Sequence, residues 1–206
     1  MARAGLSREA VTRIALDLVD AGGTTGFADL TLAKVAAEAG VATPSLYKHV
    51  GSLAALRREV AVVAARDLRA ELVDRALGRS GPDALRALAH GIRAYAHARP
   101  GRYAAVQVAA DPADPADAEL AAASAELVGV MGAVLRGFAL PDDRAVDVVR
   151  SVRAGVHGFV ALELGGGFRL PRDLDRSFAV LVDLLVTGIA ALADAPGPPD
   201  AVPGRV

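Results

Sequence analysis

Glycine and proline divide this chain into segments whose apolar residues recur every three or four positions. Apolar and polar residues almost never alternate in the pattern typical of strands. Because proline and glycine stand where helices begin or end, the pattern predicts an all-α protein of about nine helices. We expect the helices at residues 7–20, 31–39, 43–50, 52–77, 82–98, 100–109, 115–138, 141–164 and 173–193.

Composition places the 206 residues among globular proteins that bury a sizeable core, with 53% hydrophobic and 23% charged residues. The formal net charge is −1, so no overall basic excess indicates nucleic-acid binding, and any DNA site must be local. The chain has no cysteine, which excludes disulfides, thiolate metal sites and cysteine nucleophiles. This composition fits a cytoplasmic location.

Two features bear on targeting and membranes. The start of the chain, "MARAGLSREAV", lacks the apolar core of a signal peptide. The longest apolar run, residues 178–193, contains Asp183 and is shorter than a membrane-spanning helix. We therefore expect a buried helix there and no membrane partner.

The stretch "GVATPSLYKHV", residues 40–50, concentrates chemical variety in an otherwise Ala-, Val- and Leu-rich chain. Gly40 separates two short helices, and apolar residues such as Leu46 and Val50 can hold them together, which describes a helix-turn-helix. Thr43 followed by Pro44 is typical of a helix cap and first position. With Leu46 and Val50 inward, the outward residues are Thr43, Pro44, Ser45, Tyr47, Lys48 and His49.

Such a surface has the chemistry that reads duplex DNA. Hydroxyl and methyl groups can contact base edges in the major groove, while Lys and Tyr reach phosphate oxygens. The helix N-terminus also favours a nearby anion. The alternative is a solvated face, because short two-helix turns occur in many helical bundles.

The order "TLAKVAAEAGVATPSLYKHVGSLAALRREV" resembles the DNA-binding domain of the TetR family of bacterial transcription regulators. The resemblance implies that Thr43, Pro44, Ser45 and Lys48 face bases or the adjoining backbone. It also implies that Tyr47, His49 and Thr31 contact phosphates. Many family members have a lysine where this chain has Gly51-Ser52-Leu53, so Ser52 and the helix N-terminus would serve there, with weaker non-specific attraction to DNA.

Residues 150–189 resemble a TetR C-terminal class marked by a Trp-His-Gly tripeptide, although Val156 stands in the Trp place before His157-Gly158. The resemblance implies a helix-turn-helix domain at 1–51 and a ligand-binding and dimerisation domain at 52–194. A Pro-rich tail at 195–206 is predicted to be disordered.

Polar side chains within otherwise apolar helices are candidates for orienting a small apolar ligand, or are core residues with satisfied hydrogen bonds. These are Tyr95, Tyr103, Gln107 and His157. The last two helices are expected to pack against a second copy of the chain. The predicted dimer residues are Val148, Val152, Phe159, Leu162, Phe178, Leu181, Leu185 and Ile189.

No catalytic, metal or cofactor site is predicted. His90 and His97 are seven residues apart, too far for a joint metal site, and "GGGF" at 165–168 lacks the Lys-Ser/Thr of a phosphate loop. The sequence thus predicts a ligand-responsive, homodimeric repressor of a near-palindromic operator. The alternatives are a helical enzyme or small-molecule carrier whose N-terminal helices are only structural, and an adaptor that binds a protein partner.

Overall fold

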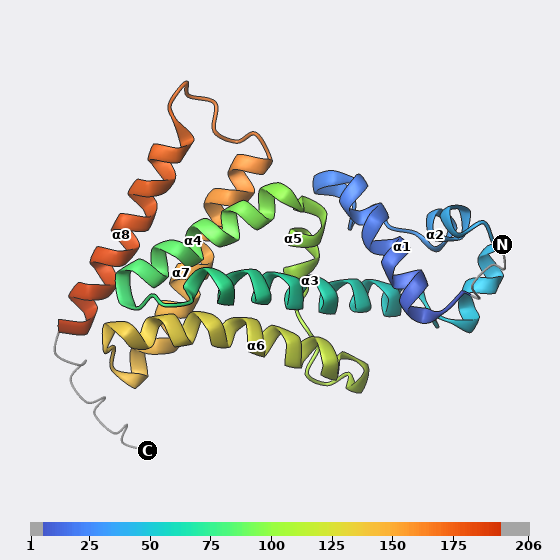
Figure 1. The fold of residues 1–206 in the computed structure, drawn as a ribbon, viewed down its shortest axis with the longest axis horizontal. Helices are drawn as coiled ribbons and strands as arrows, with labels where there is room; N and C mark the ends of the chain where they lie inside the picture. The colour runs from blue at the N-terminus through green and yellow to red at the C-terminus, as the bar shows by residue number, and fades with distance from the viewer. Residues whose placement is uncertain (1–5, 195–206) are drawn as a thin grey trace, which may run out of the picture.

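The computed structural model describes residues 6–194, and every regular element in this part of the chain is a helix (Figure 1). The predicted disordered tail, 195–206, lies outside the described residues. The α-helices are α1 (Arg8–Ala21), α2 (Leu32–Ala39), α3 (Leu53–Ala76), α4 (Gly81–Ala98), α5 (Pro100–Val106), α6 (Ala118–Leu135), α7 (Asp142–Leu164) and α8 (Leu174–Asp194). Short 3-10 helices are η1 (Gly23–Thr25), η2 (Thr43–Lys48), η3 (Pro115–Asp117) and η4 (Arg136–Phe138). The predicted all-α class is confirmed.

The N-terminal head consists of α1, α2 and η2 around a small core. Ser7 caps α1 by accepting a hydrogen bond from the Ala10 N–H at 3.2 Å, and Thr31 caps α2 by accepting from the Lys34 N–H at 3.2 Å. Gly40 ends α2 with φ 66°, in the left-handed region that favours glycine. Both caps are the first residues of the ranges predicted for these helices, 7–20 and 31–39, and Gly40 stands where the sequence predicts the break between two helices. Residues that are almost fully buried in the head include Val11, Val19, Val35, Leu46 and Val50.

The segment 43–50 differs from the prediction in one respect. It folds as the 3-10 helix η2, whose capping position is Ala42 and has no side-chain capping hydrogen bond. Thr43 is instead the first residue inside the helix, so the prediction that it caps is wrong. Pro44 follows at the second position, where its missing N–H leaves no hydrogen bond unmade.

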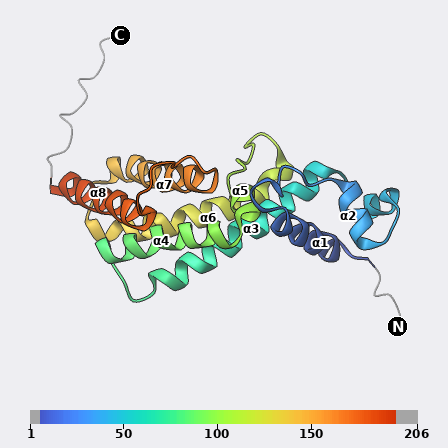
Figure 2. The same cartoon turned by 90° about the horizontal axis from the view of Figure 1, so that it is seen from above.

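The 24-residue helix α3 joins the head to the C-terminal bundle (Figure 1). Its first turn is capped by Ser52, which accepts from the Ala55 N–H at 3.0 Å. The helices α4, α5 and α6 pack along α3, and α7 and α8 lie together on one side of the bundle (Figure 2). Leu68, Leu72, Leu85 and Leu88 are buried between these helices. The long helix therefore connects the core of the bundle to the head.

The prediction that the helix at 178–193 is buried is wrong for the single chain, because only one side of it is covered. Phe178, Val182 and Ile189 of α8 face the core, but Val180 and Leu184 on the opposite side are 53% and 67% exposed. By length and apolarity, α8 and residues 115–138 could each cross a membrane. That is weak evidence, because core helices of soluble proteins have the same length and composition.

Candidate functional site

The outward surface of the head is built on η2. Leu46 and Val50 are buried beneath it, at 0% and 2% exposure, whereas Tyr47 is 56% exposed. Pro44 and Lys48 are also exposed, and Thr43, Ser45 and His49 are half-buried. The structure thus brings the six predicted residues of this segment together at one end of the molecule, with the apolar residues as the base that holds them.

Thr31 and Ser52 lie at the starts of the two flanking helices, α2 and α3. Each hydroxyl oxygen accepts a backbone N–H of its own helix, and its O–H can still donate, because a hydroxyl both donates and accepts. Both residues are exposed. Each therefore presents a donor beside a helix N-terminus, which suits an anionic oxygen.

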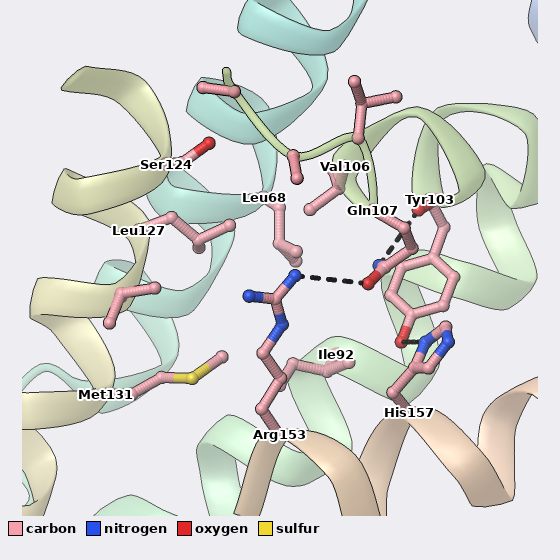
Figure 3. Close-up of a pocket in the computed structure, with 14 residues that line it drawn as sticks. Leu68, Ile92, Tyr103, Val106, Gln107, Ser124, Leu127, Met131, Arg153 and His157 are labelled. Carbon is pink, nitrogen blue, oxygen red and sulfur yellow. Dashed lines mark hydrogen bonds between the residues drawn. The ribbon is translucent and has the colours of Figure 1, made fainter. Parts of the chain in front are cut away.

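A cavity in the bundle brings three of the four predicted ligand-binding residues together (Figure 3). It has a volume of about 130 Å³. The lining is Leu68, Ile92, Tyr103, Val106, Gln107, Val108, Ala109, Ala110, Ser124, Leu127, Val128, Met131, Arg153 and His157. Tyr95 is absent from this lining. Its side chain is buried at 2% exposure and its hydroxyl donates to the Ala64 carbonyl at 3.3 Å, so it is the satisfied core residue of the alternative prediction.

Tyr103 and His157 form a polar pair on one wall of the cavity, with the Tyr103 hydroxyl 3.0 Å from His157 Nδ1. Burial raises the pKa of Tyr103 to about 12. Burial, reinforced by the nearby positive charge of Arg153, lowers the pKa of His157. The tyrosine therefore keeps its proton at neutral pH and the imidazole is neutral, so the two side chains share one hydrogen bond whose donor is set by the ring tautomer.

Arg153 is a cavity residue that the sequence prediction missed. It extends from α7 toward the cavity, where a guanidinium nitrogen lies 3.5 Å from Gln107 Oε1 (Figure 3). The signal in the sequence was an arginine between Val152 and Val156 on the face that carries His157 four residues later. An exposed arginine on a helix is so common that this spacing alone did not single it out.

The cavity helix α5 is tied to the head by Arg102, next to Tyr103. Arg102 Nε donates to Asp20 of α1 at 2.9 Å, and Nη1 donates to Asp67 of α3 at 2.6 Å. Helix α5 approaches α1 closely because residue 101, just before Arg102, is a glycine. A Cβ at Gly101 would lie 2.2 Å from the Val19 carbonyl oxygen, which no side chain tolerates. A wall of the cavity therefore packs directly on the backbone of α1.

A second ionic link joins α3 to the segment between α5 and α6. Arg58 pairs with Asp114 at 3.1 Å and donates through Nε to Asp117. The Asp111 N–H donates to the Asp117 carboxylate, and this backbone bond, reinforced by Arg58, lowers the pKa of Asp117. Asp114 also caps η3, at 2.9 Å from the Ala116 N–H. The pairing of Arg58 with Asp114 was not predicted from the sequence, because an ion pair across 56 residues leaves no local pattern.

Four of the eight predicted dimer residues lie in the core of the single chain. Val148, Val152, Phe178 and Ile189 are 5%, 1%, 0% and 4% exposed, so they have almost no surface left for a second copy and their assignment is corrected. Leu162 is 52% exposed, and Phe159, Leu181 and Leu185 are half-buried. The exposed apolar residues of α7 and α8 are Val146, Leu162, Val180, Leu184 and Leu192. The outward register of these helices was therefore only partly predicted.

His90 and His97 also have structural partners. His90 packs edge-to-face on Phe178 with ring centroids 5.2 Å apart, and His97 Nε2 lies 2.9 Å from Glu163. Among residues 6–194, no three His, Cys, Asp or Glu side chains group closely enough to hold a metal ion.

A helix-turn-helix head carried on a helical bundle is the architecture of an HTH-type transcriptional regulator. Residues 85–185 match the family model for a Tetracyclin repressor-like C-terminal domain. The chain is 34% identical over 183 residues to the HTH-type transcriptional regulator Rv0681 of Mycobacterium tuberculosis, covering 89% of this chain and 80% of the relative. It is 27% identical over 189 residues to YobS of Bacillus subtilis, an HTH-type transcriptional regulator, covering 91% and 94%.

The chain belongs to the TetR family of transcriptional regulators and is not an enzyme. The alternatives in which the N-terminal helices are only structural are thereby corrected. Solved structures share the fold: a TetR from Streptomyces coelicolor (19% identity, TM-score 0.67, 92% of this chain and 100% of that one) is one example. A second is an Acinetobacter baumannii TetR variant in complex with minocycline (22%, 0.66, 93% and 100%). A third is BioQ with its double-stranded DNA operator (22%, 0.57, 91% and 99%).

Proposed function

We propose that this regulator binds a near-palindromic operator as a homodimer, through η2 of each copy, and that a small molecule in the bundle cavity releases it. The observation that carries the proposal is the exposed Tyr47 and Lys48 held over buried Leu46 and Val50. In support, one protein of the same fold is known with an operator and another with minocycline. We further propose that the protein is located in the cytoplasm and acts there as a repressor. We assign its C-terminal domain to the Trp-His-Gly class.

The proposed DNA contacts follow the positions on the head. Thr43, Pro44, Ser45 and Lys48 are assigned to bases or the adjoining backbone. Phosphate contacts are assigned to Thr31, Tyr47, His49 and Ser52. The two heads of a dimer would read successive major grooves about 34 Å apart.

Replacing Lys48 with Ala is expected to weaken operator affinity about 10-fold at low salt and to reduce the slope of log affinity against log salt by about 0.9, the value for one phosphate neutralised. Tyr47→Phe, which keeps the ring and removes the hydroxyl, should weaken affinity by a smaller factor. The measurement is fluorescence anisotropy with a duplex that the wild-type protein selects from a random pool.

The control for this experiment is Arg79→Ala, which removes a cation at the bundle end of α3, where Arg79 donates to the Arg75 carbonyl. It should leave both affinity and slope unchanged. Wild-type affinity and salt slope in both Lys48→Ala and Tyr47→Phe would show that η2 is not the DNA-reading segment.

The proposed release mechanism uses the contacts between the cavity and the head. A ligand against Tyr103 acts on α5, and Gly101 and Arg102 connect α5 to α1 and α3. A shift of α5 would therefore alter how the head is held. The ligand releases DNA only if it binds the altered arrangement more tightly, because equal affinity for both states shifts nothing.

Arg102→Gln is expected to loosen the head from the bundle. Losing the guanidinium leaves the Asp20 and Asp67 carboxylates without their shared partner, and breaking a partly buried, bidentate contact costs about 1–2 kcal/mol. Backbone amides of α1 should then exchange with deuterium about 10-fold faster, while those of α4 keep the wild-type rate. Hydrogen exchange followed by mass spectrometry measures both helices in one sample.

Arg66→Gln serves as the matched control, since it removes an exposed pair with Glu119 at 3.1 Å and exposed pairs contribute little. Equal exchange of α1 in Arg102→Gln and the wild type would mean that Arg102 does not hold the head.

The homodimer is proposed from the exposed apolar residues of α7 and α8. Monomeric soluble proteins rarely leave extended apolar patches uncovered, and these two helices present five large apolar side chains to solvent. A twofold axis across them would bring like faces together, as isologous dimers require.

A further inference from the structure

We infer that the cavity ligand is a small anion, a monocarboxylate with an apolar body about the size of a benzene ring. The inference rests on the proposed function in taking this cavity as the effector site. It concerns the charge and size of the ligand, which neither the fold nor the family relationship sets.

The charge of the lining is one-sided. Of the fourteen lining residues, only Arg153, His157 and Tyr103 titrate, and none is a carboxylate. Because His157 is neutral and Tyr103 keeps its proton, the guanidinium is the single charge of the lining. A cationic ligand would be repelled, and a neutral one would leave the guanidinium without an ionic partner.

Arg153 also differs from the arginines of the bundle that form ion pairs. Arg58, Arg66, Arg69, Arg75, Arg86, Arg93, Arg102 and Arg150 each pair with a carboxylate. Within residues 6–194, the hydrogen bond found for Arg153 is a long one, 3.5 Å to the amide oxygen of Gln107. A neutral acceptor at that distance is a weak partner. The planar guanidinium is thus free to bind a carboxylate through two parallel N–H···O bonds.

The remaining walls define the body of the ligand. Leu68, Ile92, Val106, Leu127 and Met131 surround the space next to Arg153 (Figure 3). A dry cavity of about 150 Å³ holds one benzene molecule in an engineered protein, and this cavity has about 130 Å³. Larger drug-like molecules need pockets of about 300 Å³ or more, so a compact aromatic or branched aliphatic acid fits best.

Tyr103 and Gln107 supply further polar groups near the guanidinium. Gln107 Nε2 donates to the Tyr103 carbonyl at 3.2 Å, which fixes the amide with its oxygen toward Arg153. A bound carboxylate would take the place of that oxygen as the partner of Arg153. A carboxylate would therefore be a stronger hydrogen-bond partner for Arg153 than the amide oxygen of Gln107 is.

The test measures binding of benzoate, phenylacetate and 3-methylbutanoate against benzamide, phenylacetamide and benzylamine by isothermal titration calorimetry with the full-length protein. At least one carboxylate should bind about 10-fold or more tightly than its amide, and benzylamine should bind more weakly than either. Arg153→Gln should weaken the affinity for the carboxylate about 10-fold, which removes the preference, and should leave the affinity for the amide unchanged. Arg150→Gln, on the same helix but paired with Asp147 at 3.5 Å, should behave as the wild type.

Equal affinity for acid and amide, absence of binding by all three carboxylates at millimolar concentration, or an unaltered preference in Arg153→Gln would each overturn the inference. Operator affinity measured in parallel separates this result from the proposed function. Operator binding that persists while carboxylates fail overturns only the ligand class. Carboxylate selectivity in a protein that binds no duplex overturns the proposed function and leaves the ligand class standing.

Discussion

Leu184→Glu is expected to convert the protein from a dimer to a monomer at micromolar concentration and to weaken operator affinity about 100-fold or more. Leu184 is 67% exposed in the single chain and lies on α8 beside the groove between α7 and α8, where Gly188 and Leu192 follow. In a twofold dimer the substitution places two carboxylates in one apolar contact, and each loses hydration without gaining a partner. Loss of the dimer lowers operator affinity because a single head reads only one half-site.

Sedimentation equilibrium gives the association state, and anisotropy with the selected duplex gives the affinity. The matched control is Leu77→Glu, which makes the same change at a residue that is 80% exposed and lies just after α3. It should remain dimeric. A Leu184→Glu protein that is dimeric with unchanged affinity would show that the copies associate through another face.

Glu163→Gln is expected to lower the free energy of unfolding by about 3 kcal/mol at pH 7. Arg93 donates to the Glu163 carboxylate through Nε at 2.9 Å and Nη2 at 2.6 Å, and His97 lies 2.9 Å from the same carboxylate. The Glu163 side chain is only 8% exposed. Arg93 holds the pKa of Glu163 at about 2, below its ordinary value of 4.5, and a shift of that size corresponds to about 3 kcal/mol.

The site ties three helices together, which adds to the expected effect. Arg93 of α4 also pairs with Asp175 of α8 at 2.8 Å and lies over the Phe178 ring, 4.9 Å from its centre, while Glu163 is the second-last residue of α7. Losing the carboxylate leaves Arg93 with one exposed partner. For a chain of this length the midpoint of thermal unfolding should fall by about 10 °C.

The pH dependence follows from the lowered pKa. A carboxyl group whose pKa is lower in the folded state stabilises the fold above the unfolded pKa, and this contribution is lost as pH falls through the folded pKa. The difference in the free energy of unfolding between wild type and Glu163→Gln should therefore have its full value above about pH 5, shrink below pH 4.5 and vanish below about pH 2. Urea unfolding at pH 7 and pH 3, at one protein concentration, measures it.

Glu126→Gln provides the comparison on the surface, because Glu126 is 58% exposed and lies 3.4 Å from Arg69. Its cost should be under about 1 kcal/mol. An equal cost for the two substitutions, or a difference from wild type that is unchanged at pH 3, would show that the Arg93–Glu163 contact does not carry this stability.

Local sequence signals predicted the helices well because each depends on residues close together in the chain. Ser7, Thr31, Ser52 and Gly40 act at the helix ends where the pattern places them. The inward Leu46 and Val50, and hence the outward surface of η2, follow from the same local spacing. The capping role of Thr43 did not follow, since the 3-10 helix begins one residue earlier than predicted and Thr43 is its first residue.

The cavity was predictable only in part. Polar residues inside apolar helices pointed to Tyr103, Gln107 and His157, which the fold does bring together, and equally to Tyr95, which bonds to the Ala64 carbonyl away from the cavity. The same pattern describes a ligand-facing group and a satisfied core group, and only the packing of α3, α4 and α7 around each residue distinguishes them.

The sequence by itself determined most helix boundaries and the composition of the outward surface of η2, because capping, backbone conformation and helical spacing are set by residues a few positions apart. Only the tertiary structure decided which faces of α7 and α8 remain uncovered, which polar residues share the cavity, and which charges pair. Arg58 with Asp114, Arg93 with Glu163 and Arg102 with Asp20 join residues more than 50 positions apart. Such pairs depend on where whole helices lie in space, and that follows from the combined packing of the core.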